Sequence, residues 1–195
     1  MTWEQDSAWE ARWWGACINT YAEEAKQIIY APRMGLQWEN LDGTSPYQIN
    51  LQGRSVLDIG GGPVSLLLKC HNRGRAVVVD PCEYPAWVRS KYEHVGIEMM
   101  AVMAENLGEI GIFDEVWIYN VLQHVREPAQ VVTQARQHGR ILRAFDWLEV
   151  PVGAGHPHYL TEEMLNRLYG GEGKVEMLSG LCAGKAYYGI FVGGK

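Results

Sequence analysis

Two carboxylates and a run of glycines carry the strongest chemical signal in this sequence. Asp58 lies within the apolar segment 56–59, and three consecutive glycines at 60–62 follow it directly. Glycines have no side chains, so a ligand can approach the backbone there closely. A second apolar segment, 76–79, ends at Asp80. Strand, glycine turn, helix, strand and acid in this order are typical of one half of a nucleoside-binding sheet, with Asp80 placed to accept hydrogen bonds from ribose hydroxyls.

The glycine turn and Asp80 are each compatible with a second role. A glycine turn after a strand also occurs in enzymes that bind nicotinamide dinucleotides, but Ser65 stands where their third glycine is expected. The third glycine normally permits close packing of helix against strand, so this departure counts against a dinucleotide. Asp80 precedes Pro81 and could instead form a turn or cap a helix.

Histidines offer acid–base chemistry further along the chain. His124 follows the apolar segment 113–119, and an imidazole titrates near neutral pH, so it can act as a general base. Capping of the following helix, or orientation of a loop, is the alternative role. The loop 146–158 carries four more polar candidates: Asp146, Glu149, His156 and His158. They could gather a metal ion, but a single His-Pro-His lacks a third firm ligand, and we expect a polar pocket wall or a plain connection without metal.

The expected secondary structure places these residues at one edge of a sheet. Expected strands cover residues 55–59, 75–79, 97–102, 113–119, 140–145, 174–178 and 186–192. Expected helices cover residues 63–71, 85–94, 127–137 and 161–169. Thr161 is a typical N-cap for the last of these. The alternation predicts an α/β fold with a mostly parallel, seven-stranded, Rossmann-like sheet covered by helices on both faces. The last two strands are joined too closely for a crossover, so they should form an antiparallel hairpin.

The N-terminal segment predicts a helical cap that ends near Pro32 and is divided at Gly15. Apolar residues recur there at spacings of three and four: Trp9, Trp13, Cys17, Tyr21, Ala25 and Ile28. Such a stripe is typical of the buried face of a helix. Alternatively, Trp13, Trp14 and Tyr21 form an aromatic lid that excludes water from a ligand.

Length and composition limit the possible classes of protein. The 195 residues suffice for one domain, in which we expect 1–52 to form the helical cap and loop and 53–195 the ligand-binding core. The net charge of −6 disfavours a nucleic-acid partner. The four cysteines show no CxxC spacing, which favours reduced thiols and a cytoplasmic location. No segment approaches the roughly 20 apolar residues of a membrane span, and no signal peptide is evident.

The combined pattern resembles that of class I S-adenosylmethionine-dependent methyltransferases, over roughly residues 53–192. Segment 56–62 resembles the family's first motif, and Asp80–Pro81–Cys82 resembles its acidic motif after the second strand. Segment 104–107 stands where the family has its adenine-contacting loop, and 113–125 resembles its fourth motif. The form Asn–Val–Leu–x–His–Val within that motif is most similar to small-molecule methyltransferases of the quinone-biosynthesis type.

The resemblance implies S-adenosylmethionine as cofactor and assigns roles to particular residues. The cofactor would be held by Asp58, Gly60, Gly61, Gly62, Asp80, Pro81, Glu105, Asn106, Asn120, Val121 and Gln123. Which of Glu105 and Asn106 faces adenine stays open. His124 is the candidate catalytic base. The acceptor would meet Tyr21, Trp147, Glu149, His156 and His158.

These roles predict a methyltransferase that acts on a small-molecule acceptor. Val121–Leu122–Gln123 replaces the Pro-Pro-aromatic sequence of enzymes that methylate amino groups on bases or glutamine, so that chemistry is not supported. A macromolecular acceptor (RNA, DNA or protein) and a non-catalytic accessory subunit that binds the cofactor remain the alternatives. The acceptor site would be open, covered by the N-terminus, or completed by a second subunit of a homodimer.

Overall fold

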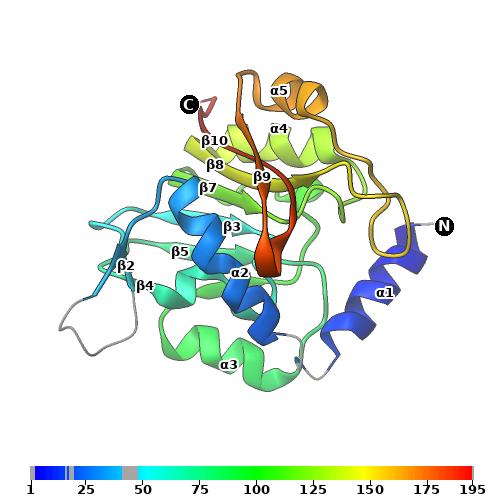
Figure 1. Ribbon diagram of the computed structural model, residues 1–195. Coiled ribbons are helices and arrows are strands. Elements are labelled where there is room, and N and C mark those ends of the chain that lie inside the picture. The colour runs from blue at the N-terminus through cyan, green and yellow to red at the C-terminus, as the bar shows by residue number, and fades with distance from the viewer. Residues whose placement is uncertain (1–2, 16, 18–19, 41–47, 195) are drawn as a thin grey trace.

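The main sheet of the protein contains seven strands, seen in a computed structural model that describes residues 3–15, 17, 20–40 and 48–194 (Figure 1). The strands are β3 (Val56–Ile59), β5 (Ala76–Val79), β6 (Glu98–Met100), β7 (Phe113–Tyr119), β8 (Gly139–Leu148), β9 (Lys174–Leu178) and β10 (Gly184–Val192). Their order is β6-β5-β3-β7-β8-β10-β9. The first five are parallel, whereas β10 runs antiparallel to both β8 and β9. The predicted sheet and its terminal hairpin are confirmed.

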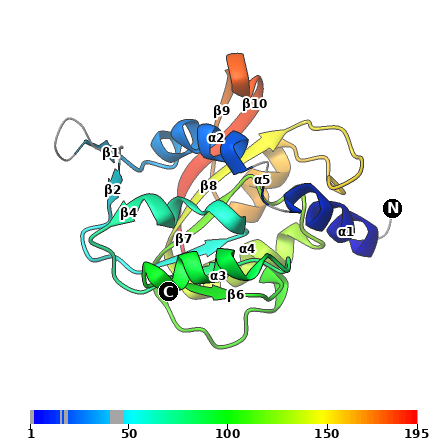
Figure 2. The same cartoon turned by 90° about the horizontal axis from the view of Figure 1, so that it is seen from below.

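Helices cover both faces of this sheet (Figures 1 and 2). They are α1 (Trp3–Trp14), α2 (Thr20–Arg33), α3 (Ala86–His94), α4 (Pro128–His138) and α5 (Glu162–Tyr169). Leu57 and Ile59 of β3 share a core with α4 and α5, whereas Val56 shares the opposite core with α2 and α3. Successive residues of a strand point to opposite faces, so a continuous apolar run serves two cores. None of these described helices is long and apolar enough to cross a bilayer.

The two N-terminal helices occupy different places. α2 packs on the sheet, whereas α1 lies beyond one end of it (Figures 1 and 2). The predicted division is confirmed, since α1 ends at Trp14. The predicted single buried stripe is wrong: Tyr21 and Ile28 are 76% and 64% exposed. α2 buries Gln27 and Tyr30 instead, because the break lets each helix turn a different face to the protein.

The predicted helix over residues 63–71 is also wrong. The chain forms two short 3₁₀ turns, Gly62–Val64 and Leu66–Lys69, followed by the strand β4 (Cys70–His71). Ser65 separates the turns with a non-helical backbone (φ −48°, ψ 146°), because its hydroxyl is held by the buried carboxylate of Asp58. β4 joins β1 (Trp38–Glu39) and β2 (Gln48–Asn50) in a small second sheet, and the latter two strands lie in a segment that was expected to be a loop.

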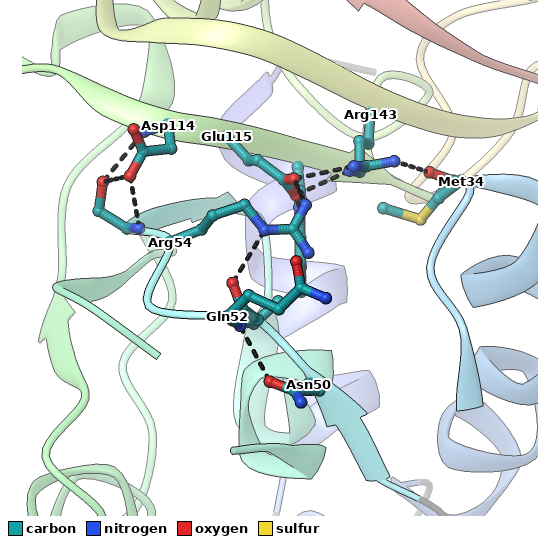
Figure 3. A network of polar contacts seen from close by, with 10 residues as sticks. Met34, Asn50, Gln52, Arg54, Asp114, Glu115 and Arg143 are labelled. Carbon is teal, nitrogen blue, oxygen red and sulfur yellow. Dashed lines mark hydrogen bonds and ion pairs between the residues drawn. The ribbon is translucent and has the colours of Figure 1, made fainter. Parts of the chain in front are cut away.

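A buried ion network ties β7 to β8 and to the end of α2 (Figure 3). The Glu115 carboxylate accepts hydrogen bonds from Arg143 at 2.7 and 2.8 Å and from the Trp117 indole at 2.8 Å, and it also pairs with Arg54. Arg143 donates a further bond to the Met34 carbonyl, 2.7 Å away. Burial penalises the Glu115 charge, but Arg143, Trp117 and Arg54 together outweigh it and hold the pKa of Glu115 below its usual value.

Candidate active site

A cavity of about 360 Å³ lies at the carboxyl ends of the parallel strands. Ligands of open α/β sheets bind at this edge. Its wall contains these residues from the segments after β3, β5, β6 and β7: Gly60, Gly61, Gly62, Asp80, Pro81, Glu105, Asn120, Val121, Gln123 and His124. The topology therefore brings together most of the residues that the sequence pattern singled out.

The N-terminal helices form the remaining side of the cavity. α1 contributes Trp9, Glu10, Trp13 and Trp14, and α2 contributes Ala22, Glu23 and Lys26. The rings of Trp9 and Trp13 are stacked, with centroids 5.3 Å apart. The charged members of this wall were not predicted, because the sequence of a helix does not show which of its polar residues will face a distant cavity.

The glycine turn is built so that side chains are excluded from it. Gly60 and Gly62 have φ angles of +70° and +59°, a region that L side chains rarely adopt. A Cβ on Gly60 would lie 2.5 Å from the Val121 side chain, and one on Gly61 would lie 2.6 Å from Asp58 Oδ2. Backbone and neighbours therefore both require glycine, which leaves main-chain atoms as the surface of the cavity here.

Asp80 is fixed in the cavity wall by main-chain donors. Its Oδ2 accepts a hydrogen bond from the Gly62 amide at 3.1 Å, and its Oδ1 accepts one from the Cys82 amide at 2.9 Å. The residue is only 7% exposed. Burial raises the pKa of Asp80, and these hydrogen bonds oppose the rise. The carboxylate is thus held in one position beside the glycine turn.

Two other aspartates support the site from beneath. Asp58 Oδ2 accepts hydrogen bonds from Ser65 and, at 2.7 Å, from the Tyr119 hydroxyl. Asp146 Oδ1 accepts the amides of Val121 and Leu122, each at 3.1 Å. Within the described part of the chain, Asp58 Oδ1 and Asp146 Oδ2 are buried without a hydrogen-bond partner. Burial raises the pKa of both aspartates to about 7. Their hydrogen bonds fix the loops that carry the residues of the cavity wall.

Replacing Asp146 with asparagine should reduce the pH dependence of stability. The folded-state pKa of about 7 lies above the ordinary 3.8, so the stabilising contribution of the protonated carboxyl is complete below about pH 4 and is lost as the pH rises through about 7. Asparagine keeps an acceptor for the two amides without the charge. Urea unfolding at about pH 5 and about pH 8 measures the free energy of unfolding of both proteins. From the lower to the higher pH, the stability of the variant relative to the wild type should rise by about 1 kcal/mol or more. A difference in stability that stays constant, or that falls, would contradict this expectation.

His124 lies in the wall with its ring between α1 and the loop after β8. Its Nδ1 is 3.0 Å from Glu10 Oε1 and 2.6 Å from the Gly155 carbonyl. Burial lowers the pKa of His124, but Glu10, the Gly155 carbonyl and Asp146 together outweigh it and raise the pKa above its usual value. The alternative role as a helix cap is not observed, because the N-cap of α4 is Glu127.

The remaining predicted residues divide into two groups. Trp147 and His156 lie in the wall, as does Glu105, whose carboxylate also accepts the amides of Arg126 and Glu127 at 3.0 and 3.1 Å. The residues that do not reach the wall are Asn106, Tyr21, Glu149 and His158.

The four polar residues considered as metal ligands do not converge. Glu149 pairs with Lys185 at 2.6 Å, and His158 Nε2 lies 2.9 Å from the Val125 carbonyl. Across the residues that the structure describes, no group of three or more His, Cys, Asp and Glu side chains could hold a metal ion.

Strand order, glycine turn and Asp80 together have the arrangement of a class I methyltransferase domain of the S-adenosylmethionine-dependent type. Residues 57–141 match the family model described as a methyltransferase domain. The predicted class and fold are confirmed at the level of this domain, and S-adenosylmethionine is the cofactor of the class.

The sequence is also similar to curated proteins that are named for a modification of tRNA. A tRNA U34 carboxymethyltransferase of Shewanella sp. (strain ANA-3) is 31% identical over 123 residues, which cover 58% of this chain and 37% of that protein. The chain thus spans little more than a third of the length of the curated relatives it matches.

Solved structures share the fold at low sequence identity. Magnesium protoporphyrin IX methyltransferase from Synechocystis PCC 6803 with bound S-adenosylhomocysteine gives a TM-score of 0.61 at 17% identity, covering 90% of this chain and 84% of that one. A second match is a chain of the complex between the Haloferax volcanii Trm112 methyltransferase activator and the putative methyltransferase. Its TM-score is 0.64 at 9% identity, and the match covers 94% of this chain and 97% of that one.

Proposed function

We propose that this protein transfers a methyl group from S-adenosylmethionine to a small-molecule acceptor. The observation that carries the proposal is the composition of the cavity wall: strand ends typical of a cofactor site on one side and the protein's own α1 and α2 on the other. The cavity has a volume of about 360 Å³, and the side that α1 and α2 form carries aromatic side chains that suit a small acceptor. The N-terminus would cover this acceptor.

The residues fit this cofactor. A Cβ on Gly62 would have Asp80 Oδ2 3.9 Å away and Tyr84 Oη 3.7 Å away, so the glycine leaves a cradle next to a fixed carboxylate. Asp80 would accept hydrogen bonds from the ribose hydroxyls, and the glycine turn, held by Asp58, would admit the methionine part. Pro81 and Glu105 would flank the adenosine, with Asn106 behind the wall. Bound S-adenosylmethionine supplies an electrophilic methyl group on a positively charged sulfur.

The acceptor would lie between the bound cofactor and the aromatic residues of α1. Trp9, Trp13 and Trp147 offer flat faces on which a planar acceptor can stack. The same helix excludes water, and holding the acceptor in line with the methyl group supplies most of the catalysis. His124, with His156 beside it at 4.7 Å between ring centroids, is the proposed base. Tyr21, Glu149 and His158 are left out of the proposed site.

A tRNA acceptor is the second candidate, supported by the 31% identical relative. Against it stand the net charge of −6 and the acidic residues of the cavity wall, since contacts with a phosphate backbone require a basic surface. An accessory role without catalysis is the third candidate.

Methyl transfer from radiolabelled S-adenosylmethionine into fractions of a cell lysate should distinguish these candidates. We expect label in the small-molecule fraction. Removal of residues 1–15 should keep binding of S-adenosylhomocysteine and lower transfer at least tenfold, because the aromatic wall is lost while α2 stays. α2 itself must be retained, since Tyr30 and Ala31 are fully buried in the core. Label in RNA or protein would reject the small acceptor, and tight cofactor binding with no label in any fraction would favour the accessory role.

A further inference from the structure

Glu10 on α1 meets His124, which lies more than a hundred residues later in the chain. Their side chains are 3.0 Å apart and only 16% and 20% exposed. Two further contacts hold the helix against the same loop: Asp6 Oδ1 accepts the Gly155 amide at 3.0 Å, and the Gly155 carbonyl lies 2.6 Å from His124 Nδ1.

Gly155 is the position that allows this approach. Its φ of +77° favours glycine, and a Cβ there would lie 2.5 Å from the Trp9 ring and 2.8 Å from Glu10 Oε1. Any side chain at Gly155 would therefore push α1 away from His124. The docking of α1 and the contact between Glu10 and His124 therefore both depend on the close packing of α1 against Gly155.

The hydrogen bonds around His124 are consistent with only one neutral tautomer. Nδ1 donates to the carbonyl of Gly155 at 2.6 Å, so it must carry a proton. The Glu10 carboxylate lies 3.0 Å from the same nitrogen as an ion pair, and its Oε1 accepts no hydrogen bond from the described residues. Nε2 lies 3.1 Å from the amide nitrogen of Gln123, which also donates to Asn120 Oδ1 at 3.0 Å. An amide nitrogen has two hydrogens and no lone pair to offer. Nε2 is therefore the unprotonated atom. Its lone pair, which here accepts from the Gln123 amide, becomes available to an acceptor hydroxyl that displaces this amide.

The wider surroundings of His124 are mainly acidic. Charged or titratable groups act on its ring from each element packed around it: Glu10 on α1, Glu23 on α2, Asp146 on β8, and His156 on the loop that follows. Asp6 and Lys26 act on His156 in turn. Of these groups, Glu10 makes the ion pair with the His124 ring.

We propose that Glu10 is a positioning residue whose carboxylate strengthens His124 as a base through their ion pair, so that the base is complete only when α1 is docked on the cavity. This inference rests on the proposed function. It also narrows the acceptor to a molecule whose nucleophile carries a proton, such as a hydroxyl on a planar ring stacked against the tryptophans. In the reaction the acceptor oxygen forms a bond to the methyl carbon and the carbon–sulfur bond breaks. The hydroxyl proton moves to His124 Nε2 and then to water, and the cofactor leaves as neutral S-adenosylhomocysteine.

The test is a pH titration of His124 by nitrogen-15 NMR in protein loaded with S-adenosylhomocysteine. The wild type should show the proton on Nδ1 in the neutral form. Glu10→Gln, which has nearly the same shape, should titrate His124 at lower pH, because the carboxylate no longer stabilises the imidazolium. Glu10→Asp should restore part of the difference. Glu4→Gln, at an exposed acid on the same helix, should behave as the wild type.

A second readout is the pH profile of methyl transfer into the small-molecule fraction. Glu10→Gln should move the acidic limb of the profile to lower pH and lower the high-pH plateau at least tenfold, with unchanged affinity for S-adenosylhomocysteine. Titration of His124 at the same pH in the wild type and Glu10→Gln, or the proton on Nε2, would overturn the inference while leaving the proposed function intact. Failure of the wild type to bind S-adenosylhomocysteine would instead refute the proposed function.

Discussion

Replacement of Asp80 by asparagine should weaken binding of S-adenosylhomocysteine by about 30- to 150-fold and leave the fold intact. Hydrogen bonds to a charged group contribute about 1.5–3 kcal/mol each, and removal of the charge weakens both bonds to the ribose, so a total of about 2–3 kcal/mol is a moderate expectation. Asparagine has nearly the same shape as aspartate and keeps one acceptor for the amides of Gly62 and Cys82. Titration calorimetry measures the affinity directly.

Glu83→Gln is the matched control for this experiment, because Glu83 is an exposed acid three residues further along the chain. It removes the same charge from the same segment and should leave the affinity unchanged. Equal affinities of Asp80→Asn and the wild type, with both proteins folded by circular dichroism, would remove Asp80 from the cofactor site.

Replacement of Glu115 by alanine should lower the free energy of unfolding by about 3–5 kcal/mol, because it leaves a buried guanidinium without its partner. Glu115 is fully buried, and Arg143 is 7% exposed. The effect should be largest near neutral pH. The pKa of Glu115 is held below its usual value in the folded state, so its stabilising contribution is present above the unfolded-state pKa and is lost as the pH falls through the folded one.

Chemical denaturation of single and double variants can separate the loss of the Glu115–Arg143 pair from the cost of leaving one buried charge unpaired. The double variant Glu115→Leu with Arg143→Met should be less destabilised than Glu115→Ala alone, since neither charge is then left unpaired. Glu163→Gln, which breaks a solvent-exposed pair with Arg167 on α5, should have no measurable effect. If Glu115→Ala unfolds at the same denaturant concentration as Glu163→Gln, the network contributes little to stability.

The sheet could be predicted from the sequence because its signals are local. Strands such as 76–79 are continuous apolar runs bounded by charged residues, and each run can be recognised without knowledge of its neighbours. The segment 63–71 could not be predicted in the same way. Its leucines suit a helix, but the Asp58 carboxylate reaches Ser65 and interrupts the helix, which is a tertiary effect.

In the candidate site, too, the residues with a local sequence signal could be predicted and those placed by tertiary packing could not. Gly60, Asp80 and Asn120 follow strand ends, and the topology alone brings strand ends together. The side formed by α1 depends on how a separate helix docks, and no spacing between Glu10 and His124 indicates that they meet. The tryptophans gave a partial signal. Trp13 and Trp14 lie in the cavity wall, but Tyr21, the third residue of the predicted lid, does not, so the lid stays a prediction. A buried stripe does not account for Trp13, which is 47% exposed.

The most direct test of the proposed site is the structure of the protein with S-adenosylhomocysteine bound. We predict that the ribose hydroxyls lie within hydrogen-bonding distance of Asp80, the homocysteine part lies over residues 60–62, and the sulfur faces the space between His124 and α1. Binding of the ligand anywhere else on the protein, or with the ribose turned away from Asp80, would contradict this prediction.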